Sequence, residues 1–365
     1  MNELTKMISD SATKLFADTC TEALRVLAEQ GEWQSSLWDM AADLGLTMIR
    51  PGGPEEDPLD LVALVTIAGV AGAHAVPLPL MENLLARRAL AAAGLDDEAL
   101  EGPLTLVGLP SDLNLTGEPG SWRLSGRLAR VPWGRNATAV VATAASADGP
   151  RTVVVMGAQP THLDINCAHE PRDTFDLSAW PISDAWVGQP GTAASAGVLY
   201  REGALIRAAQ MAGAMQAVLT MTVQYARERV QFGRPIAQFQ AIQHQVVELA
   251  SQAAASQAAM LAAALAGDGA AFEAGAAKLR ASEAAGTVIA AAHQVHGAMG
   301  FTYEHPLHFH TRRLMAWRDE FGNEVEWARW IGEQVACLGG DHLWAMIVAP
   351  EQYRSLQTGA VAGHA

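Results

Sequence analysis

The stretch YARERVQFGRPIAQFQAIQH, residues 225–244, ends one predicted helix and begins the next. Gly233 can adopt the positive φ that a helix end favours, and Pro235 prevents the first helix from continuing. The chain is therefore expected to turn at residues 232–235 and then to enter a second helix. Arg229 lies at the carboxyl end of the first helix, where a positive charge is favourable and a guanidinium can bind a phosphate through two hydrogen bonds.

A second stretch, QVHGAMGFTYE at residues 294–304, follows an alanine-rich helical segment. Gly297 and Gly300 lack a Cβ atom, so backbone amides at these positions can come close to a phosphate or a ribose. Either stretch alone is a weak signal. Both together, in this order and inside helical sequence, form a specific pattern.

The patterns R-x-x-F-G-x-x-x-x-x-x-Q and Q-x-x-G-x-x-G resemble the C-terminal helical domain of acyl-CoA dehydrogenases. In that family these positions hold the adenosine and pyrophosphate part of an FAD that lies mainly in the neighbouring subunit. The resemblance implies FAD contacts for five residues: Arg229, Phe232, Gln240, Gln294 and Gly297. The alternative interpretation is that Arg229 is a solvated helix-end charge and Gln240 an ordinary polar residue of a helix.

The composition fits a chain of two or three domains, because it has 365 residues of which half are hydrophobic. A net charge of −15 and a pI near 5.1 argue against binding to nucleic acids or anionic membranes. Three widely spaced cysteines without a C-x-x-C pair predict neither a disulfide framework nor a zinc site, and they fit a reducing cytoplasm. Residues 1–16 have the pattern of an amphipathic helix and not of a signal peptide. We therefore expect a cytoplasmic protein with no nucleic-acid or membrane partner.

The residue patterns predict an α+β protein with three domains. These are an N-terminal helical domain at 1–103, a small middle β-domain at 104–190, and a C-terminal four-helix bundle at 196–350 that carries the FAD-contacting motifs, followed by a tail at 357–365. Short β-rich runs separated by Gly, Pro and Asp predict a small antiparallel sheet or barrel in the middle domain.

Long alanine-rich helices are predicted in the C-terminal domain, over residues 197–229, 240–266 and 270–297. Their smooth faces suit close packing in a bundle or against another subunit. Residues 249–267 carry no charge, but their Ser and Gln residues favour a close-packed helix over a membrane span. Residues 61–81 are also uncharged, and their prolines and His74 favour a buried helix that ends near Ala73.

The middle domain departs from the family pattern. In the family, a T-E-x-x-x-G-S-D-like stretch and a K-x-W-I-T-N-like stretch hold the flavin ring in this domain. Neither is present, and Asp112 and Trp133 stand isolated.

The catalytic base is also missing at the positions that the resemblance implies. The family uses a Glu, at one of two positions, to remove the α-proton of the acyl group. The motifs place these positions at Phe321 and Gly203, and neither residue can accept a proton. A register slip of one residue would place Glu320 or Glu202 there instead, so the sequence assigns no catalytic residue.

Retained nucleotide contacts without a base resemble the non-catalytic chain of heteromeric, steroid-CoA type acyl-CoA dehydrogenases. The resemblance implies a heterotetramer with FAD as cofactor, a catalytic partner subunit, a bulky acyl-CoA substrate of steroid breakdown, and an electron acceptor such as an electron-transfer flavoprotein. Two alternatives remain open. One is a self-sufficient homo-oligomeric dehydrogenase with a displaced Glu base, and the other is a flavin-free scaffold protein with the same fold.

His305, His308 and His310 crowd together in EHPLHFH. Their spacing is not that of a zinc-binding H-E-x-x-H motif, and no second cluster completes a ligand set. We expect structural or surface histidines and no metal.

Overall fold

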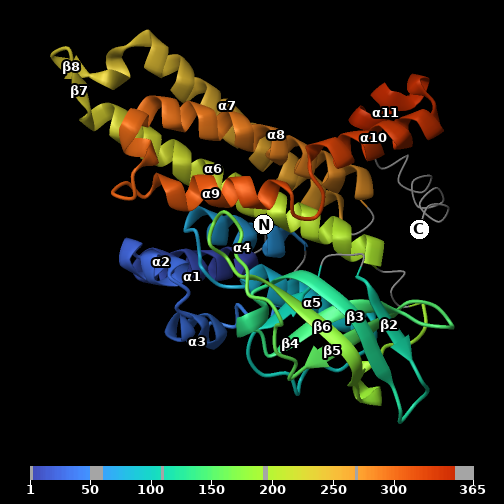
Figure 1. Ribbon diagram of the computed structural model, residues 1–365. Helices are drawn as coiled ribbons and strands as arrows, with labels where there is room; N and C mark the ends of the chain where they lie inside the picture. The colour runs from blue at the N-terminus through green and yellow to red at the C-terminus, as the bar shows by residue number, and fades with distance from the viewer. Residues whose placement is uncertain (1–2, 50–60, 108–110, 192–195, 268–269, 350–365) are drawn as a thin grey trace. The chain divides into compact units, whose positions relative to one another are not determined.

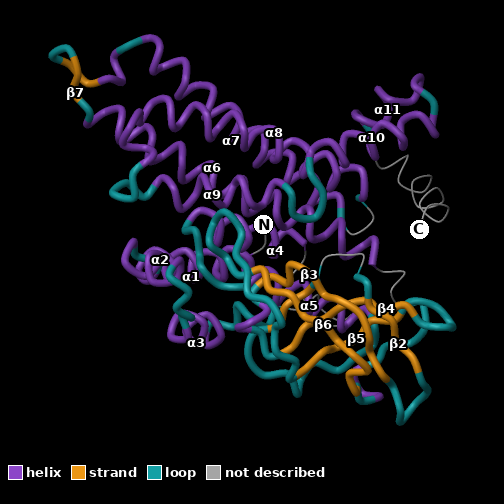
Figure 2. The backbone as a smooth tube through the Cα atoms, viewed as in Figure 1, coloured by secondary structure: helices purple, strands orange, loops and turns teal. Residues whose placement is uncertain are grey.

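The computed structural model describes residues 3–49, 61–107, 111–191, 196–267 and 270–349 (Figure 1). Helices form both ends of the chain and strands its middle (Figure 2), which confirms the α+β prediction. The predicted tail at 357–365 lies outside the described residues.

Two compact units make up the chain. The first comprises residues 1–9, 61–75 and 204–365, and the second comprises residues 10–60 and 76–203. Both α1 (Glu3–Thr19) and α6 (Ala196–Glu228) run from one unit into the other. The three domain boundaries expected from the sequence stay predictions.

The first unit is helical. Besides its parts of α1 and α6 it contains α4 (Leu61–Ala73), α7 (Gln240–Ala266), α8 (Ala271–His296), α9 (Leu307–Arg318), α10 (Glu324–Leu338) and α11 (Leu343–Val348). The three long helices of the C-terminal region begin and end within one residue of the predicted bounds. In this unit α7 and α8 lie side by side (Figure 1).

The second unit combines short helices with a sheet. Its helices are the remaining parts of α1 and α6, together with α2 (Glu22–Glu29), α3 (Ser35–Asp43) and α5 (Leu80–Ala92). Its strands are β1 (Leu104–Leu106), β2 (Leu113–Thr116), β3 (Arg123–Pro132), β4 (Ala139–Ala145), β5 (Arg151–Met156) and β6 (Arg172–Pro181).

The sheet is mixed, which corrects the expectation of an antiparallel one. β4 pairs in parallel with β1 and β2 and antiparallel with β5, while β3 pairs antiparallel with β2 and β6. A parallel pair needs a long crossover connection, and the chain between β1 and β4 supplies one that includes the β2–β3 hairpin. Strand alternation buries one face, for example Leu113 and Leu115 of β2, against Leu124, Val153 and Phe175.

Helices α4 and α6 cross at close range within the first unit. A Cβ atom on Gly213 would lie 1.9 Å from the backbone oxygen of Gly69, and one on Gly72 would lie 2.0 Å from the backbone oxygen of Gln210. Only glycine lets the two backbones come this close. The glycine positions of both helices therefore fix where the helices cross.

Helix α7 is the one described helix that is long and apolar enough to cross a membrane by length and composition. About a third of its apolar window is buried within the chain. Core helices of globular domains meet the same criterion. Its buried side chains pack towards α8 and α4.

The helix crossing gives a first prediction. We expect Gly213→Ala to lower the free energy of unfolding by about 3 kcal/mol or more, because the added methyl meets backbone atoms that cannot move independently. Gly286→Ala in α8 is the matched control, since its Cβ would meet nothing closer than the Arg318 side chain at 3.8 Å. That control should be neutral or should stabilise by about 0.5–1 kcal/mol. Urea unfolding of both variants measures the difference, and equal stabilities would contradict the crossing.

Candidate functional site

The first motif forms a small hairpin at the end of α6. Strands β7 (Val230–Gln231) and β8 (Arg234–Pro235) pair antiparallel around a two-residue turn. Phe232 and Gly233 have φ values of 53° and 81°, the positive values that a tight turn of this hand requires. The predicted turn is thus present. It is a hairpin, and α7 begins after it at Gln240.

The hairpin presents its side chains outwards. Phe232 is 92% exposed, and its only aromatic neighbour among the described residues is the edge of Phe239 at 6.1 Å. The guanidinium of Arg234 lies 4.2 Å from the centre of the Phe239 ring. Arg229 and Gln240 are exposed, and neither side chain makes a hydrogen bond or an ion pair within the described part of the chain.

The second motif forms the end of α8 and a 3-10 turn, Gly297–Phe301. Gly297 has a φ of 58°, and a Cβ atom placed there would meet nothing within 4 Å. Glycine is therefore required for the turn of the backbone, while the space above that backbone is open. This is the arrangement that allows a ligand to approach a main-chain amide.

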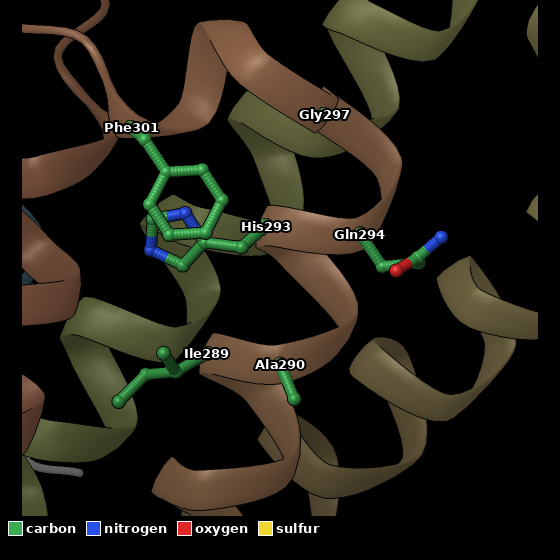
Figure 3. Close-up of a pocket in the computed structure, with 6 residues that line it drawn as sticks. All are labelled: Ile289, Ala290, His293, Gln294, Gly297 and Phe301. Atoms are coloured by element: carbon green, nitrogen blue, oxygen red, sulfur yellow. The ribbon is translucent and has the colours of Figure 1, made fainter.

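Gln294 and Gly297 line a depression of about 380 Å³ (Figure 3). The other lining residues are Ile289, Ala290, His293 and Phe301. His293 and Phe301 stack with their ring centres 4.4 Å apart, on one side of the helix, while Gln294 points to the other side. The sequence did not assign His293 or Phe301. The sequence feature that could have identified these two residues is their position beside the glycine motif.

Packing joins the two motifs. Ala226 and Ile236, which flank the hairpin, form a buried cluster with Val295 of α8. The Tyr225 hydroxyl donates a hydrogen bond to the His296 backbone oxygen at 3.2 Å, and the two rings stack at 4.5 Å. The structure therefore brings both motifs to one end of the bundle. Arg229, Phe232 and Gln240 lie on the hairpin side, outside the residues that line the depression.

His296 is a buried neutral imidazole directly before Gly297. Its Nδ1–H donates to the Ala292 oxygen at 2.8 Å, and its Nε2 is buried with no hydrogen-bond partner among the described residues. Burial is the main cause that lowers the pKa of His296 to about 4, and the nearby His305 and His293 lower it further. The turn that carries Gly297 is thus built on an imidazole that resists protonation.

Two histidines of EHPLHFH form hydrogen bonds with backbone oxygens. His308 Nδ1 donates to the His305 oxygen at 2.9 Å, and His310 Nε2 donates to the Ala73 oxygen of α4 at 2.9 Å. Over the described ranges, no group of three or more His, Cys, Asp or Glu side chains could hold a metal ion.

The loop between α9 and α10 carries the first expected base position. Phe321 occupies it with a φ of 54°. Lys278 of α8 is fully buried beneath this loop, and its Nζ donates to the oxygens of Arg318 and Gly322, both at 2.7 Å, and to Ser282 Oγ at 3.0 Å. Burial lowers the pKa of Lys278 to about 7, while Glu320 acts to raise it. Hydrogen bonds from Lys278 therefore fix the backbone of this loop.

The carboxylates next to the two expected base positions, Glu320 and Glu202, are each bound by an arginine. Glu320 accepts hydrogen bonds from Arg207 of α6, with Nε at 2.8 Å and a terminal nitrogen at 2.7 Å, and Arg207 is 3% exposed. Its guanidinium lies 5.7 Å from the Trp317 ring and 6.0 Å from the Phe321 ring.

Glu202 is held in the same manner within the second unit. It accepts from Nε and a terminal nitrogen of Arg88 at 2.7 and 2.6 Å. In both cases an arginine binds the carboxylate directly. Neither carboxylate could approach a substrate proton without first leaving its arginine.

Comparison with known proteins gives one family. The model for the "Acyl-CoA dehydrogenase, C-terminal domain" matches residues 192–327. The acyl-CoA dehydrogenase IpdE2 of Mycobacterium tuberculosis is 39% identical over 110 residues, which are 30% of this chain and 34% of that protein. The mitochondrial short-chain specific acyl-CoA dehydrogenase of Bos taurus is 30% identical over 209 residues, 53% of this chain and 50% of that protein. The chain thus spans a third to a half of the length of these relatives.

Solved structures share the whole fold. A chain of the ChsE4–ChsE5 complex from Mycobacterium tuberculosis aligns over 92% of this chain and 98% of its own length, with a TM-score of 0.81 and 22% identity. Butyryl-CoA dehydrogenase from Megasphaera elsdenii aligns over 92% of this chain and 99% of its own length, with a TM-score of 0.80 and 18% identity. Residues 192–327 thus match the acyl-CoA dehydrogenase C-terminal domain, and the chain shares its fold with these solved structures.

Proposed function

We propose that this chain is the non-catalytic subunit of a heteromeric, FAD-dependent acyl-CoA dehydrogenase that introduces an α,β double bond into a bulky, steroid-derived acyl-CoA thioester. Its exposed hairpin and α8 turn hold the nucleotide part of an FAD whose ring lies in a catalytic partner chain. The partner supplies the base, and an electron acceptor such as an electron-transfer flavoprotein removes the electrons.

One observation carries this proposal. The side chains that would contact a partner's FAD are exposed and make no hydrogen bond or ion pair with other described residues, while the carboxylates beside both base positions are bound by arginines. A chain that acted alone would need the reverse arrangement at its base, a carboxylate with an open approach to the substrate.

Two similar solved structures support the proposed assembly and substrate class. One is a complex of two chains, ChsE4 and ChsE5, and the other is a Tcur3481-Tcur3483 steroid ACAD variant, with a TM-score of 0.79. They make a heteromer and a steroid-derived acyl group the first choices to test for this chain.

The residues at the bundle end fit the nucleotide part of FAD. Arg229 offers a guanidinium to the pyrophosphate, and Gln240 and Gln294 offer amide groups to hydroxyls or phosphates. The backbone at Gly297 is open to a ligand, because a Cβ built there meets nothing within 4 Å. Phe232 offers an exposed aromatic face.

A bound FAD would supply the acceptor for the hydride that leaves the β-carbon of the acyl group. This chain positions and retains the cofactor. Arg229 neutralises phosphate charge, Phe232 excludes water from the edge of the bound nucleotide, and the turn at Gly297 limits its movement. Correct placement of the reacting groups makes a large contribution to rate, so these contacts affect turnover without touching the reacting atoms.

The main test measures flavin and turnover with and without a partner. We expect the chain expressed alone to purify without bound FAD. Co-expressed with a dehydrogenase-like chain from the neighbouring open reading frame, it should form a complex with fewer FAD molecules than chains and with acyl-CoA-dependent reduction of a dye acceptor. One FAD per chain, together with turnover by the chain expressed alone, would contradict the proposal and favour the displaced-base alternative. No flavin in any combination would favour the scaffold alternative.

Arg229→Ala tests the nucleotide contact. We expect it to weaken FAD binding in the complex by about tenfold or more, because a charge-assisted pair with a phosphate contributes about 1.5–3 kcal/mol. Arg227→Ala is the matched control, since Arg227 is exposed on the last turn of α6, two residues before Arg229 and outside the predicted motif. Fluorescence titration of released flavin measures both. Equal affinities for the two variants would refute the role of Arg229.

His296 makes the same end of the bundle sensitive to acid. Its pKa in the folded chain is about 4, below its ordinary value of 6.5, so the unfolded chain binds more protons between these values. Stability should therefore fall as the pH falls from 6.5 towards 4, by an amount of about 2 kcal/mol from this residue. We expect His296→Phe, which keeps a ring against Tyr225, to flatten this part of the pH dependence. His244→Gln, an exposed control on α7, should leave it unchanged. Urea unfolding at several pH values decides between these outcomes.

A further inference from the structure

Lys278 of α8 is a basic side chain that is enclosed by the protein without a carboxylate in contact. It is 0% exposed. Its Nζ lies 2.7 Å from the backbone oxygens of Arg318 and Gly322 and 3.0 Å from Ser282 Oγ, and it forms no ion pair within the described part of the chain. All three neighbours are neutral oxygens. A fully buried lysine is rare unless an opposite charge is paired with it.

These three neighbours match the hydrogen-bonding groups of a neutral amine. A neutral amine has two N–H donors and one lone pair, whereas an ammonium has three donors and no acceptor. The two backbone oxygens accept, and the Ser282 hydroxyl can either accept or donate. A neutral amine can therefore donate to both backbone oxygens and accept from Ser282. This arrangement satisfies every group without placing a charge in the interior.

The use of lysine at this position is unusual for this chain. The sequence has three lysines among its 24 lysines and arginines, and the other two, Lys6 and Lys14, are exposed in α1. Buried arginines such as Arg87 and Arg207 each bind a carboxylate. An arginine stays charged, whereas a buried lysine can lose its proton. The cation that can become neutral thus occupies a buried position that has no carboxylate in contact.

We propose that Lys278 binds the loop of residues 319–323 as a neutral amine, so that closure of this loop releases one proton from Nζ to solvent and the loop responds to pH. This inference goes beyond the proposed function, because it requires neither flavin nor a partner chain.

The backbone of this loop depends on bonds from the helices beside it. Phe321 and Gly322 have φ values of 54° and 87°, and the positive φ of Phe321 costs free energy. Trp327 Nε1 donates to the Phe321 oxygen at 2.9 Å, and Lys278 binds the next oxygen, that of Gly322. A change at the amine therefore acts directly on the strained part of the loop.

The charged groups that face Lys278 come from α6, from the end of α9 with the loop, and from α10: Arg207, Arg318, Asp319, Glu320 and Glu324. The nearest charged residues of α8 itself are Glu273, Arg280 and Glu283. Residues 249–266 of α7, the part that leads into α8, carry no titratable side chain. The three carboxylates from the loop and α10 favour the ammonium, but burial outweighs them and lowers the pKa of Lys278 to about 7.

The direction of the pH effect follows from the two states of the loop. In an open loop the hydrated amine has its ordinary pKa of 10.5, and in the closed loop the pKa is about 7. Between these values closure requires the loss of one proton, so a rise of one pH unit favours the closed loop by up to about tenfold. Below about pH 7 both states bind the proton, and the dependence ends.

Nitrogen-15 NMR of the lysine side chains tests the protonation state directly. The full chain with labelled lysine contains three Nζ atoms, and the exposed Lys6 and Lys14 serve as internal references. We expect Lys278 to show the chemical shift of a neutral amine at about pH 9 and to change to that of an ammonium near pH 7. An ammonium signal that persists above about pH 9 would overturn the proposal.

Ser282→Ala separates the two possible directions of the third hydrogen bond. A hydroxyl that donates to the neutral amine stabilises the neutral form, so its loss should raise the pKa of Lys278, by about 0.5–1. A hydroxyl that accepts from an ammonium would have the opposite effect, and a lowered pKa in this variant would contradict the neutral amine.

Lys278→Met tests the coupling between the amine and the loop. From about pH 7 to 9.5, the unfolding equilibrium constant in urea and the hydrogen-exchange opening of residues 319–323 should both fall more steeply with pH in the wild-type chain than in Lys278→Met, by up to about tenfold per pH unit. Arg280→Met is the matched control. It removes a charge that does not titrate, two residues along α8, and should keep the wild-type dependence.

Equal pH dependence in the wild-type chain and in Lys278→Met would refute the coupling. If Lys278→Met does not fold, the NMR titration of the wild-type chain and of Ser282→Ala decides the proposal, because neither measurement requires removal of the amine.

Discussion

The contact of Tyr225 with His296 is the interaction on which the candidate site depends. It joins segments 71 residues apart through a hydrogen bond to the His296 backbone and a stack of two rings. A hairpin with strands of two residues has no stability of its own. The geometry of its tip is therefore set by what lies beneath it, namely this contact and the cluster of Ala226, Ile236 and Val295. The hairpin can bind a nucleotide tightly, as proposed, only if this supporting contact is rigid.

The same bundle shows why a missing base is not easily replaced. Arg207 is buried and is satisfied by Glu320 and Gln210. A carboxylate introduced at Phe321 would compete with Glu320 for this single guanidinium, and the loser would be a charge in an apolar setting. Lys278 holds the backbone of the same loop from below. The loop is therefore specialised as a packed structural element, and a single substitution restores only the identity of a base and not its surroundings.

Local signals in the sequence were sufficient for the helices and not for the sheet. The bounds of α7 follow from Pro235 before it and Gly267 after it, and both signals act within a few residues. Parallel pairing of β1 with β4 depends on contacts between distant segments, which propensity does not encode. The ion pairs of Glu202 and Glu320 join residues more than 110 positions apart, so sequence could identify the carboxylates but not their arginines. His293 was missed because its role comes from stacking on another ring and not from a motif.

The proposed role also bears on the conformation of the hairpin tip. Phe232 is 92% exposed at a φ of 53°, and both the uncovered ring and the positive φ cost free energy in a chain by itself. A partner chain that covered Phe232, as proposed, would bury the ring and so offset part of that cost.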